Sequence, residues 1–383
     1  MNNEIPYIPR LLPIEHLLKK KSYFLFGPRQ TGKTSLINAT LKDTRVYDLL
    51  DTVTFLNLSQ NPGRIEEELT TRDRLVVIDE IQRLPELLHE VHKLIEKRKI
   101  KFLLTGSSAR SLRRGGINLL GGRARTKYLH PFTHRELGKS FKLERALSAG
   151  LVPSIYFSDD PLSDLKAYTG TYLQQEVVAE GVTRNIPAFS RFLRVAAFCN
   201  GTVVNYTSVA NDAQVPRTTV YEYFDILKDT LIIYELPAWK KTVKRKPLVS
   251  SKYYFFDCGV VSSLQKRQFS PGSTEYGEAF ETYIAHEIRA YRDYISDEPI
   301  NFWRSASGYE VDFILGEHTA IEVKAKRNVS SQDLRALSAL AEEKKMRNYI
   351  CVCLEFRRRK SGDIQILPYG EFLDELWDGS FKE

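Results

Sequence analysis

The stretch Gly27-Pro28-Arg29-Gln30-Thr31-Gly32-Lys33-Thr34 decides how this chain is interpreted. It matches the phosphate-loop pattern G-x-x-x-x-G-K-[ST] at every fixed position and follows an apolar run that ends at Phe26. In such loops backbone N–H groups surround the phosphates, the lysine reaches the β- and γ-phosphates, and the last hydroxyl ligates Mg²⁺. We therefore predict an ATP site formed by these residues and Ser35, with Lys33 on the phosphates and Thr34 on the metal.

A second motif supports the first. Leu75-Val76-Val77-Ile78 reads as a strand buried on both faces, and it ends in Asp79-Glu80. We predict that Asp79 contacts the nucleotide and its Mg²⁺, and that Glu80 orients or deprotonates the attacking water.

A third predicted strand, Lys101 to Gly106, ends in hydroxyls. Open α/β sheets bind ligands at the carboxyl ends of their strands. Ser107 or Ser108 could therefore sense the γ-phosphate, and Ser107 is the one we assign.

Several motifs follow in a fixed order and together resemble one family. They are the phosphate loop, Val-Ile-Asp-Glu-Ile-Gln, Leu-Leu-Thr-Gly-Ser-Ser, Leu-Leu-Gly-Gly-Arg (119–123) and His-Pro-Phe-Thr-His-Arg-Glu-Leu (130–137). This order is similar to that of prokaryotic AAA+ ATPases with a C-terminal, nuclease-related domain of unknown function. The resemblance implies an α/β fold, a homo-oligomer in which a hexameric ring is plausible, and Arg123, or less favourably Arg125, as an arginine finger. The alternative is a solvated basic loop, because Arg110, Arg113 and Arg114 lie nearby.

Length and composition agree with a globular protein of several domains. The chain has 383 residues, 42% of them hydrophobic, and a formal charge of +8, which suggests a polyanionic partner. No apolar run approaches the roughly 20 residues of a bilayer span, so no membrane partner is predicted. The four cysteines are scattered and form no C-x-x-C pair, which fits a reducing cytoplasm.

The middle of the chain predicts a winged helix, and with it a DNA partner. A short helix begins near Val204, and a second spans Arg217 to Lys228 after a turn at Gln214-Val215-Pro216. Two strands, Leu231–Leu236 and Tyr253–Asp257, then enclose a basic segment. Residues at the start of the second helix could enter a DNA groove, and basic residues of the wing could neutralise phosphates. The candidates are Arg217, Thr218, Thr219, Tyr221, Lys240, Lys241, Lys244, Arg245 and Lys246. The alternative is a winged helix used for protein contacts.

The last third predicts a second site. A helix over 278–291 precedes a hairpin of two strands, Tyr309–Leu315 and Ala320–Ala325. Carboxylates and a lysine on paired strands suit a divalent metal and a water nucleophile. This arrangement resembles the PD-(D/E)xK nuclease core, which implies Asp312, Glu322 and helical Glu281 as metal ligands and Lys324 as a catalytic residue. Val311 stands where the motif has proline. A structural or DNA-holding domain is an equal alternative.

The sequence thus predicts four units: an AAA+ core over 1–145, a helical lid over 146–195, a winged helix over 196–262 and a nuclease-like domain over 263–383. The predicted function is ATP-driven binding and remodelling of DNA, at branched or otherwise unusual structures, with metal-dependent cleavage left open. The alternative is an ATP-dependent switch or defence sensor whose C-terminal domain only docks partners.

Overall fold

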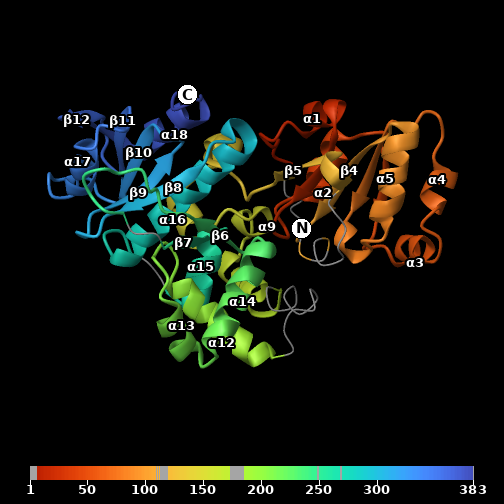
Figure 1. Cartoon of the computed structure of the whole chain (residues 1–383), viewed down its shortest axis with the longest axis horizontal. Helices are drawn as coiled ribbons and strands as arrows, with labels where there is room; N and C mark the ends of the chain where they lie inside the picture. The colour runs from red at the N-terminus through yellow and green to blue at the C-terminus, as the bar shows by residue number, and fades with distance from the viewer. Residues whose placement is uncertain are drawn as a thin grey trace.

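The computed structural model describes residues 7–108, 110, 112, 120–172, 185–247, 250–267 and 270–382. Figure 1 shows three groups of elements: a sheet with helices at the amino-terminal end, a second sheet at the carboxyl-terminal end, and a helical region below and between them. Candidates Arg113 and Arg114 of the basic loop lie outside the described residues.

The amino-terminal part is a five-stranded parallel sheet in the order β2-β3-β4-β1-β5. Its strands are β1 (Ser22–Phe26), β2 (Arg45–Asp48), β3 (Leu75–Asp79), β4 (Lys101–Gly106) and β5 (Ala124–Tyr128). The helices and 3₁₀ turns of this part are α1 (Ile14–Lys20), α2 (Lys33–Thr40), α3 (Thr52–Gln60), α4 (Arg64–Glu68), η1 (Ile81–Arg83), α5 (Leu87–Arg98) and η2 (Leu120–Gly122). Strands β1, β3 and β4 are almost entirely buried, as continuous apolar runs in a parallel sheet require.

The helical region continues the chain. Its first elements are α7 (His134–Leu137), η3 (Gly138–Ser140), α8 (Leu143–Ala149), α9 (Pro153–Tyr156), α10 (Pro161–Ala167) and η4 (Tyr168–Tyr172). The winged helix follows as α12 (Ile186–Phe198), α13 (Tyr206–Ala213), α14 (Arg217–Asp229), the antiparallel pair β6 (Ile233–Leu236) and β7 (Lys252–Phe255), and α15 (Cys258–Gln265). The predicted helix-turn-helix and its hairpin are therefore present.

The predicted boundary between lid and winged helix, at 195/196, falls inside α12. Residues on both sides of it, from Val152 to Leu264, share one hydrophobic cluster. Because a domain has its own core, lid and winged helix form one packing unit here.

The carboxyl-terminal part begins with α16 (Thr274–Tyr291) and η5 (Arg292–Ser296). Its six-stranded mixed sheet has the order β12-β13-β11-β10-β9-β8. The strands are β8 (Ile300–Arg304), β9 (Glu310–Leu315), β10 (Thr319–Lys324), β11 (Asn348–Cys353), β12 (Arg359–Ser361) and β13 (Ile364–Pro368), and the helices are α17 (Arg335–Ala341) and α18 (Tyr369–Trp377). The expected hairpin is β9–β10, with Thr319 opposite Leu315.

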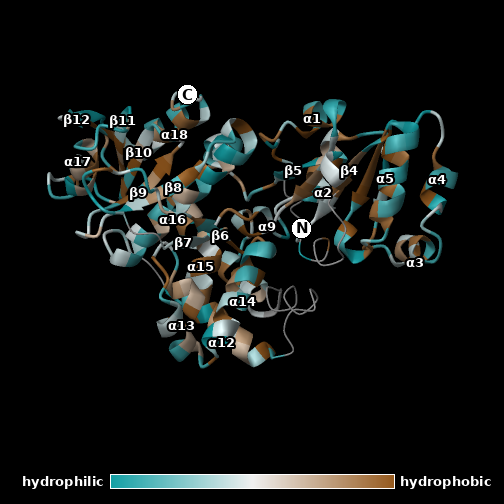
Figure 2. Ribbon diagram, viewed as in Figure 1, coloured by the Kyte–Doolittle hydropathy of each residue, from teal (hydrophilic) through white to brown (hydrophobic). Residues whose placement is uncertain are grey.

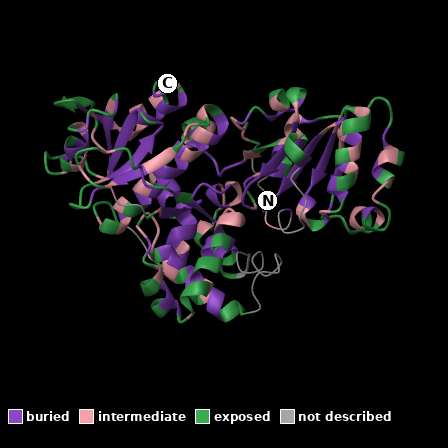
Figure 3. Cartoon of the chain, in the orientation of Figure 1, coloured by how far each residue is buried: buried purple, intermediate pink, exposed green. Residues whose placement is uncertain are grey.

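Buried apolar side chains fill the interior of both sheets, while the outer faces of helices such as α5 are polar and exposed (Figures 2 and 3). One hydrophobic cluster contains residues from Leu12 to Phe381, so the two sheet-containing parts share a continuous core.

Helices α8 and α15 meet almost backbone to backbone. A Cβ added at Gly259 would lie 2.3 Å from the carbonyl oxygen of Ala149, and one at Gly150 would lie 1.9 Å from Asp257 Oδ1. Asp257 also caps α15 at Val260 N and accepts a hydrogen bond from Leu151 N at 2.6 Å. Only glycine fits at either position.

Candidate nucleotide site and neighbouring domains

The phosphate loop connects β1 to α2, as its sequence predicts. Gly32 is the N-cap of α2 with φ of 90°, a conformation that glycine adopts without strain. Lys33 Nζ donates hydrogen bonds to the carbonyls of Gly27 and Pro28, at 2.7 and 3.3 Å. The lysine ammonium therefore lies inside the curve of the loop, beside the helix N-terminus that favours anions.

Two acidic residues lie where β3 ends: Asp79 is its last residue and Glu80 follows it. Thr34 Oγ1 donates a hydrogen bond of 2.9 Å to Asp79 Oδ2, so the two predicted metal ligands are adjacent. A hydroxyl and a carboxylate are oxygen ligands of the kind that Mg²⁺ takes beside a nucleotide. Glu80 has φ of 60°, an uncommon conformation outside glycine that concentrates at functional sites.

The hydroxyl residues at and just after the end of β4 join this arrangement. Gln82 Nε2 contacts Glu80 and donates to Ser107 Oγ at 3.2 Å, so Ser107 is linked to the predicted catalytic carboxylate. Thr105 contacts Asp79 through its hydroxyl and accepts a hydrogen bond from Glu80 N. Sequence reasoning singled out Ser107 but missed Thr105, although its place at the end of a central strand was a usable signal.

Arg10 is a second residue that sequence reasoning missed. Its buried guanidinium donates to Thr31 O and His130 O, both at 2.6 Å, and pairs with Glu136 at 3.0 Å. It ties the phosphate loop to the segment after β5.

A cavity of about 560 Å³ opens over the loop. Its lining includes Tyr7, Arg10, Arg29, Gln30, Gly32, Lys33, Thr34, Ser35, Leu50, Glu80, Phe132 and Ser154. This volume is typical of small-molecule sites and brings six of the predicted nucleotide residues together with Glu80. Ser154 Oγ donates to Gln30 at 2.8 Å and Tyr168 OH to Arg29 O at 3.3 Å, so α9 and η4 contact the loop from the helical region.

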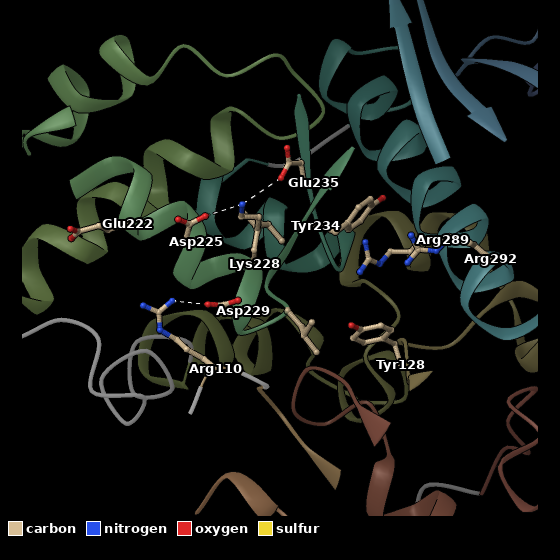
Figure 4. A pocket seen from close by; sticks show the side chains of 12 residues that line it. Arg110, Tyr128, Glu222, Asp225, Lys228, Asp229, Tyr234, Glu235, Arg289 and Arg292 are labelled. Carbon is tan, nitrogen blue, oxygen red and sulfur yellow. Dashed lines mark hydrogen bonds and ion pairs between the residues drawn. The ribbon is translucent and has the colours of Figure 1, made fainter. Parts of the chain in front are cut away.

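The segment after β4 also reaches the winged helix. Ser108 Oγ donates to the carbonyl of Asp229 at 3.3 Å, and Arg110 pairs with the Asp229 carboxylate at 2.8 Å. Figure 4 shows this ion pair at the edge of a cavity of about 680 Å³ between β5, α14, β6 and α16. On the same side Lys228 pairs with Asp225 and Glu235, and across the cavity Arg289 stacks on Tyr234 at 4.1 Å. The end of α14 is thus in direct contact with the nucleotide-binding domain.

Arg123 immediately precedes β5 and contacts Glu96 of α5. Its side chain is 37% exposed, which leaves it at the surface of this subunit. Arg125, two residues further on, lies on β5.

The start of α14 presents the predicted DNA-reading side chains. Arg217, Thr218 and Tyr221 are exposed, and Thr219 is half-buried. Arg217 donates to Tyr221 OH at 2.9 Å, and Tyr221 stacks on Tyr206 with ring centroids 4.2 Å apart. The helix start therefore combines a cation with an ordered aromatic face.

The basic wing segment lies against the carboxyl-terminal domain. Residues Ala238 and Pro247 form bridges to Phe302 and Ser305. Glu343 accepts hydrogen bonds from the backbone of Val243, Lys244 and Arg245, at 2.8 to 3.2 Å.

Two of the five predicted phosphate contacts in the wing have protein partners. Lys241 pairs with Glu317, and Arg245 with Glu342 at 2.7 Å. Lys240, Lys244 and Lys246 are exposed.

The predicted nuclease-like carboxylates lie close together. We call Glu281, Glu310, Asp312 and Glu322 the carboxylate cluster. Asp312 Oδ2 accepts a hydrogen bond from Val323 N at 2.8 Å, and Lys324 contacts Glu322. Burial and the negative charge of Asp312 raise the pKa of Glu281 to about 7.

These residues do not fit a metal site as they are arranged. Across the described ranges, no group of three or more His, Cys, Asp or Glu side chains could hold a metal ion. Glu281 Oε1 instead accepts a hydrogen bond of 2.5 Å from Tyr254 OH and faces an ammonium, that of Lys252. The predicted ligand set Glu281, Asp312 and Glu322 is therefore assembled without the geometry that a metal needs.

Comparison with protein families agrees with the fold of the amino-terminal part. Residues 19–163 match the model of an AAA domain. With its parallel sheet, phosphate loop and paired carboxylates, this part of the chain is an AAA+ P-loop ATPase domain that binds ATP. Residues 140–270 match a domain of unknown function (DUF8612), and residues 276–372 match another (DUF4143). The chain thus joins an AAA+ ATPase domain to a carboxyl-terminal domain whose function is unknown.

Solved structures resemble the chain only distantly. The Orc1 protein of Aeropyrum pernix in complex with DNA has 13% identity over 70% of this chain and 95% of that one, with a TM-score of 0.24. Replication initiator DnaA bound to AMPPCP and single-stranded DNA has 13% identity over 59% and 90%, with a TM-score of 0.28. A STAND protein of Pyrococcus horikoshii has 13% identity over 76% and 49%, with a TM-score of 0.22. No curated protein matches the sequence significantly. Among the described helices, none combines the length and apolarity needed to cross a membrane.

Proposed function

We propose that this chain hydrolyses ATP with Mg²⁺ and uses the cycle to bind and remodel DNA, including branched DNA. The observation that carries the proposal is the contact of Ser108 and Arg110 with Asp229. It joins the segment that follows β4, which includes our proposed γ-phosphate sensor Ser107, to the last residue of α14. The first residue of the same helix is Arg217, about 18 Å away for a regular helix of this length.

In the proposed coupling each residue has one role. Glu80 positions the water, Lys33 and Thr34 with Asp79 hold the phosphates and Mg²⁺, and Ser107 is linked to Glu80 through Gln82. A change at the γ-phosphate reaches the end of β4, and there the Arg110 pair transmits it to α14. Because a helix is a rigid element, a shift at one end moves the DNA-facing residues at the other.

The oligomer is part of the same proposal. Arg123 is partly exposed at the surface of the subunit, where a finger acting on a neighbouring nucleotide has to be. We propose a homo-oligomeric ring, for which six subunits are plausible. The free thiols of all four cysteines suit a cytoplasmic protein.

Metal-dependent cleavage remains a sequence-based prediction without support from the side-chain arrangement. One observation favours the second candidate function, an ATP-dependent switch or defence sensor with a docking domain: the wing lies against the carboxyl-terminal domain through Glu343. In that case ATP binding would gate assembly, and turnover would be slow and indifferent to DNA.

The deciding experiment measures ATP hydrolysis and gel shifts with single-stranded, duplex, forked and four-way DNA. We expect DNA to stimulate hydrolysis, with a preference for forked or four-way forms. Binding of none of these DNAs, together with an unchanged basal rate, would reject remodelling in favour of the switch.

A further inference from the structure

Lys252 is an unusual residue of the winged helix, because a buried lysine needs a charged partner. It lies on β7, and only 1% of its surface is exposed. Its Nζ is 2.5 Å from Glu310 Oε1 and 4.0 Å from Glu281 Oε1. The ammonium also lies 5.2 Å from the centroid of the Phe302 ring, over its face. All three partners belong to the carboxyl-terminal domain, whereas Lys252 does not.

The charges of the carboxylate cluster are almost balanced by the protein itself. Lys252 faces Glu310 and Glu281, Lys324 contacts Glu322, and Arg304 pairs with Glu310 Oε2 at 3.4 Å. Three cationic side chains thus offset most of the negative charge of the four carboxylates. A divalent ion would have to displace an ammonium that already holds two of these groups.

We propose that Lys252 is a built-in counter-cation of the carboxylate cluster, so that the cluster fastens the winged helix to the carboxyl-terminal domain instead of binding a divalent metal. The cation arrives from β7 and the carboxylates from α16 and β9, so the contact crosses the domain boundary. Separation of the two domains would expose an ammonium and several carboxylates at once. In this proposal the nuclease-like carboxylates hold the winged helix and the carboxyl-terminal domain together.

The test measures Mn²⁺ binding by the loss of the free-ion electron paramagnetic resonance signal, without nucleotide. The full-length protein carries Asp79→Asn throughout, so that the ATP site contributes no metal. With Lys252 present we expect no stoichiometric Mn²⁺ binding, and adding Asp312→Asn changes nothing. Lys252→Met should bind Mn²⁺ at least tenfold more tightly and melt at a lower temperature, with part of the loss restored by Mn²⁺.

The control is Lys246→Met, which removes an exposed lysine of the same region and should leave both readouts unchanged. If Lys252→Met does not fold, Lys252→Met/Glu310→Gln removes one charge of each sign and should fold and gain Mn²⁺ binding. Two results would overturn the proposal: a Mn²⁺ site in the Lys252-containing protein that disappears with Asp312→Asn, or a folded Lys252 variant with unchanged Mn²⁺ affinity.

Discussion

The guanidinium of Arg110 lies 2.8 Å from the carboxylate of Asp229, and this pair joins the ATPase sheet to the last residue of α14. Arg110→Ala should therefore leave ATP binding and basal hydrolysis intact and reduce the stimulation of hydrolysis by DNA. The stability cost should be only about 1 kcal/mol, because both partners are partly exposed. Steady-state hydrolysis with and without forked DNA measures the effect. The charge exchange Arg110→Asp/Asp229→Arg should recover stimulation, and no recovery would show that the pair itself does not couple the domains.

The positions of Lys33 in the phosphate loop and of Glu80 after β3 lead to two predictions about the nucleotide. Lys33→Ala should abolish hydrolysis because the phosphates lose their ammonium. Glu80→Gln should keep ATP bound and slow turnover by about 10² or more, because only the water-positioning carboxylate changes. Equilibrium binding of a fluorescent ATP analogue and single-turnover hydrolysis separate the two. Hydrolysis at the parent rate in Glu80→Gln would remove this residue from the mechanism.

The partly exposed position of Arg123 leads us to predict catalysis between subunits. Arg123→Ala should bind ATP normally and lose about 10³-fold in turnover, as an arginine finger does. Mixing it with Lys33→Ala should restore some activity, because a mixed interface pairs an intact loop with an intact finger. Arg125→Ala is the matched control and should retain activity. A fully active monomer at all concentrations would contradict the shared site.

The wing divides into two groups that should behave differently with DNA. Reversal of exposed Lys240, Lys244 and Lys246 to glutamate should weaken DNA binding for all sequences and lower the salt slope by about 1 per lost phosphate contact. Reversal of Lys241 and Arg245 should instead loosen the wing from Glu317 and Glu342, and limited proteolysis can detect this.

Arg217→Ala with Tyr221→Ala should lower affinity at the groove while the wing stays docked. An unchanged gel shift in both the exposed-lysine and the α14 variants would place the DNA contact elsewhere on the molecule.

Buried Glu287 predicts a pH dependence of stability. It accepts hydrogen bonds from His134 N at 2.7 Å and Trp377 Nε1 at 2.9 Å, yet burial raises its pKa to about 7. Because the native pKa exceeds the unfolded value near 4.5, its contribution is complete below about pH 4.5 and declines as the pH rises through 7. The loss is on the order of 3 kcal/mol. Glu287→Gln should have a flatter stability profile between pH 5 and 8 by urea denaturation. Parallel profiles would mean that Glu287 does not titrate in this range.

Sequence-based prediction works best for features whose residues are close together in the chain at a fixed spacing. The phosphate loop, the Asp79-Glu80 pair and the β9–β10 hairpin all occur where their residues indicate, because loop, strand end and tight turn depend on neighbours in the chain. Arg10, by contrast, meets Glu136 across 126 positions. In the sequence Lys252 likewise looks like another basic residue near the wing. Its pairing with Glu310 is visible only in the folded structure. Such contacts depend on tertiary packing, and no periodic pattern in the sequence predicts them.

The meeting of Gly150 with Asp257 and of Gly259 with Ala149 governs the order in which this molecule can be completed on the ribosome. The stretch after α8 is synthesised about a hundred residues before Asp257 emerges to accept the hydrogen bond of Leu151. Pairings between distant positions form late and slowly. The face of α8 that α15 covers therefore stays open to solvent until α15 has left the exit tunnel.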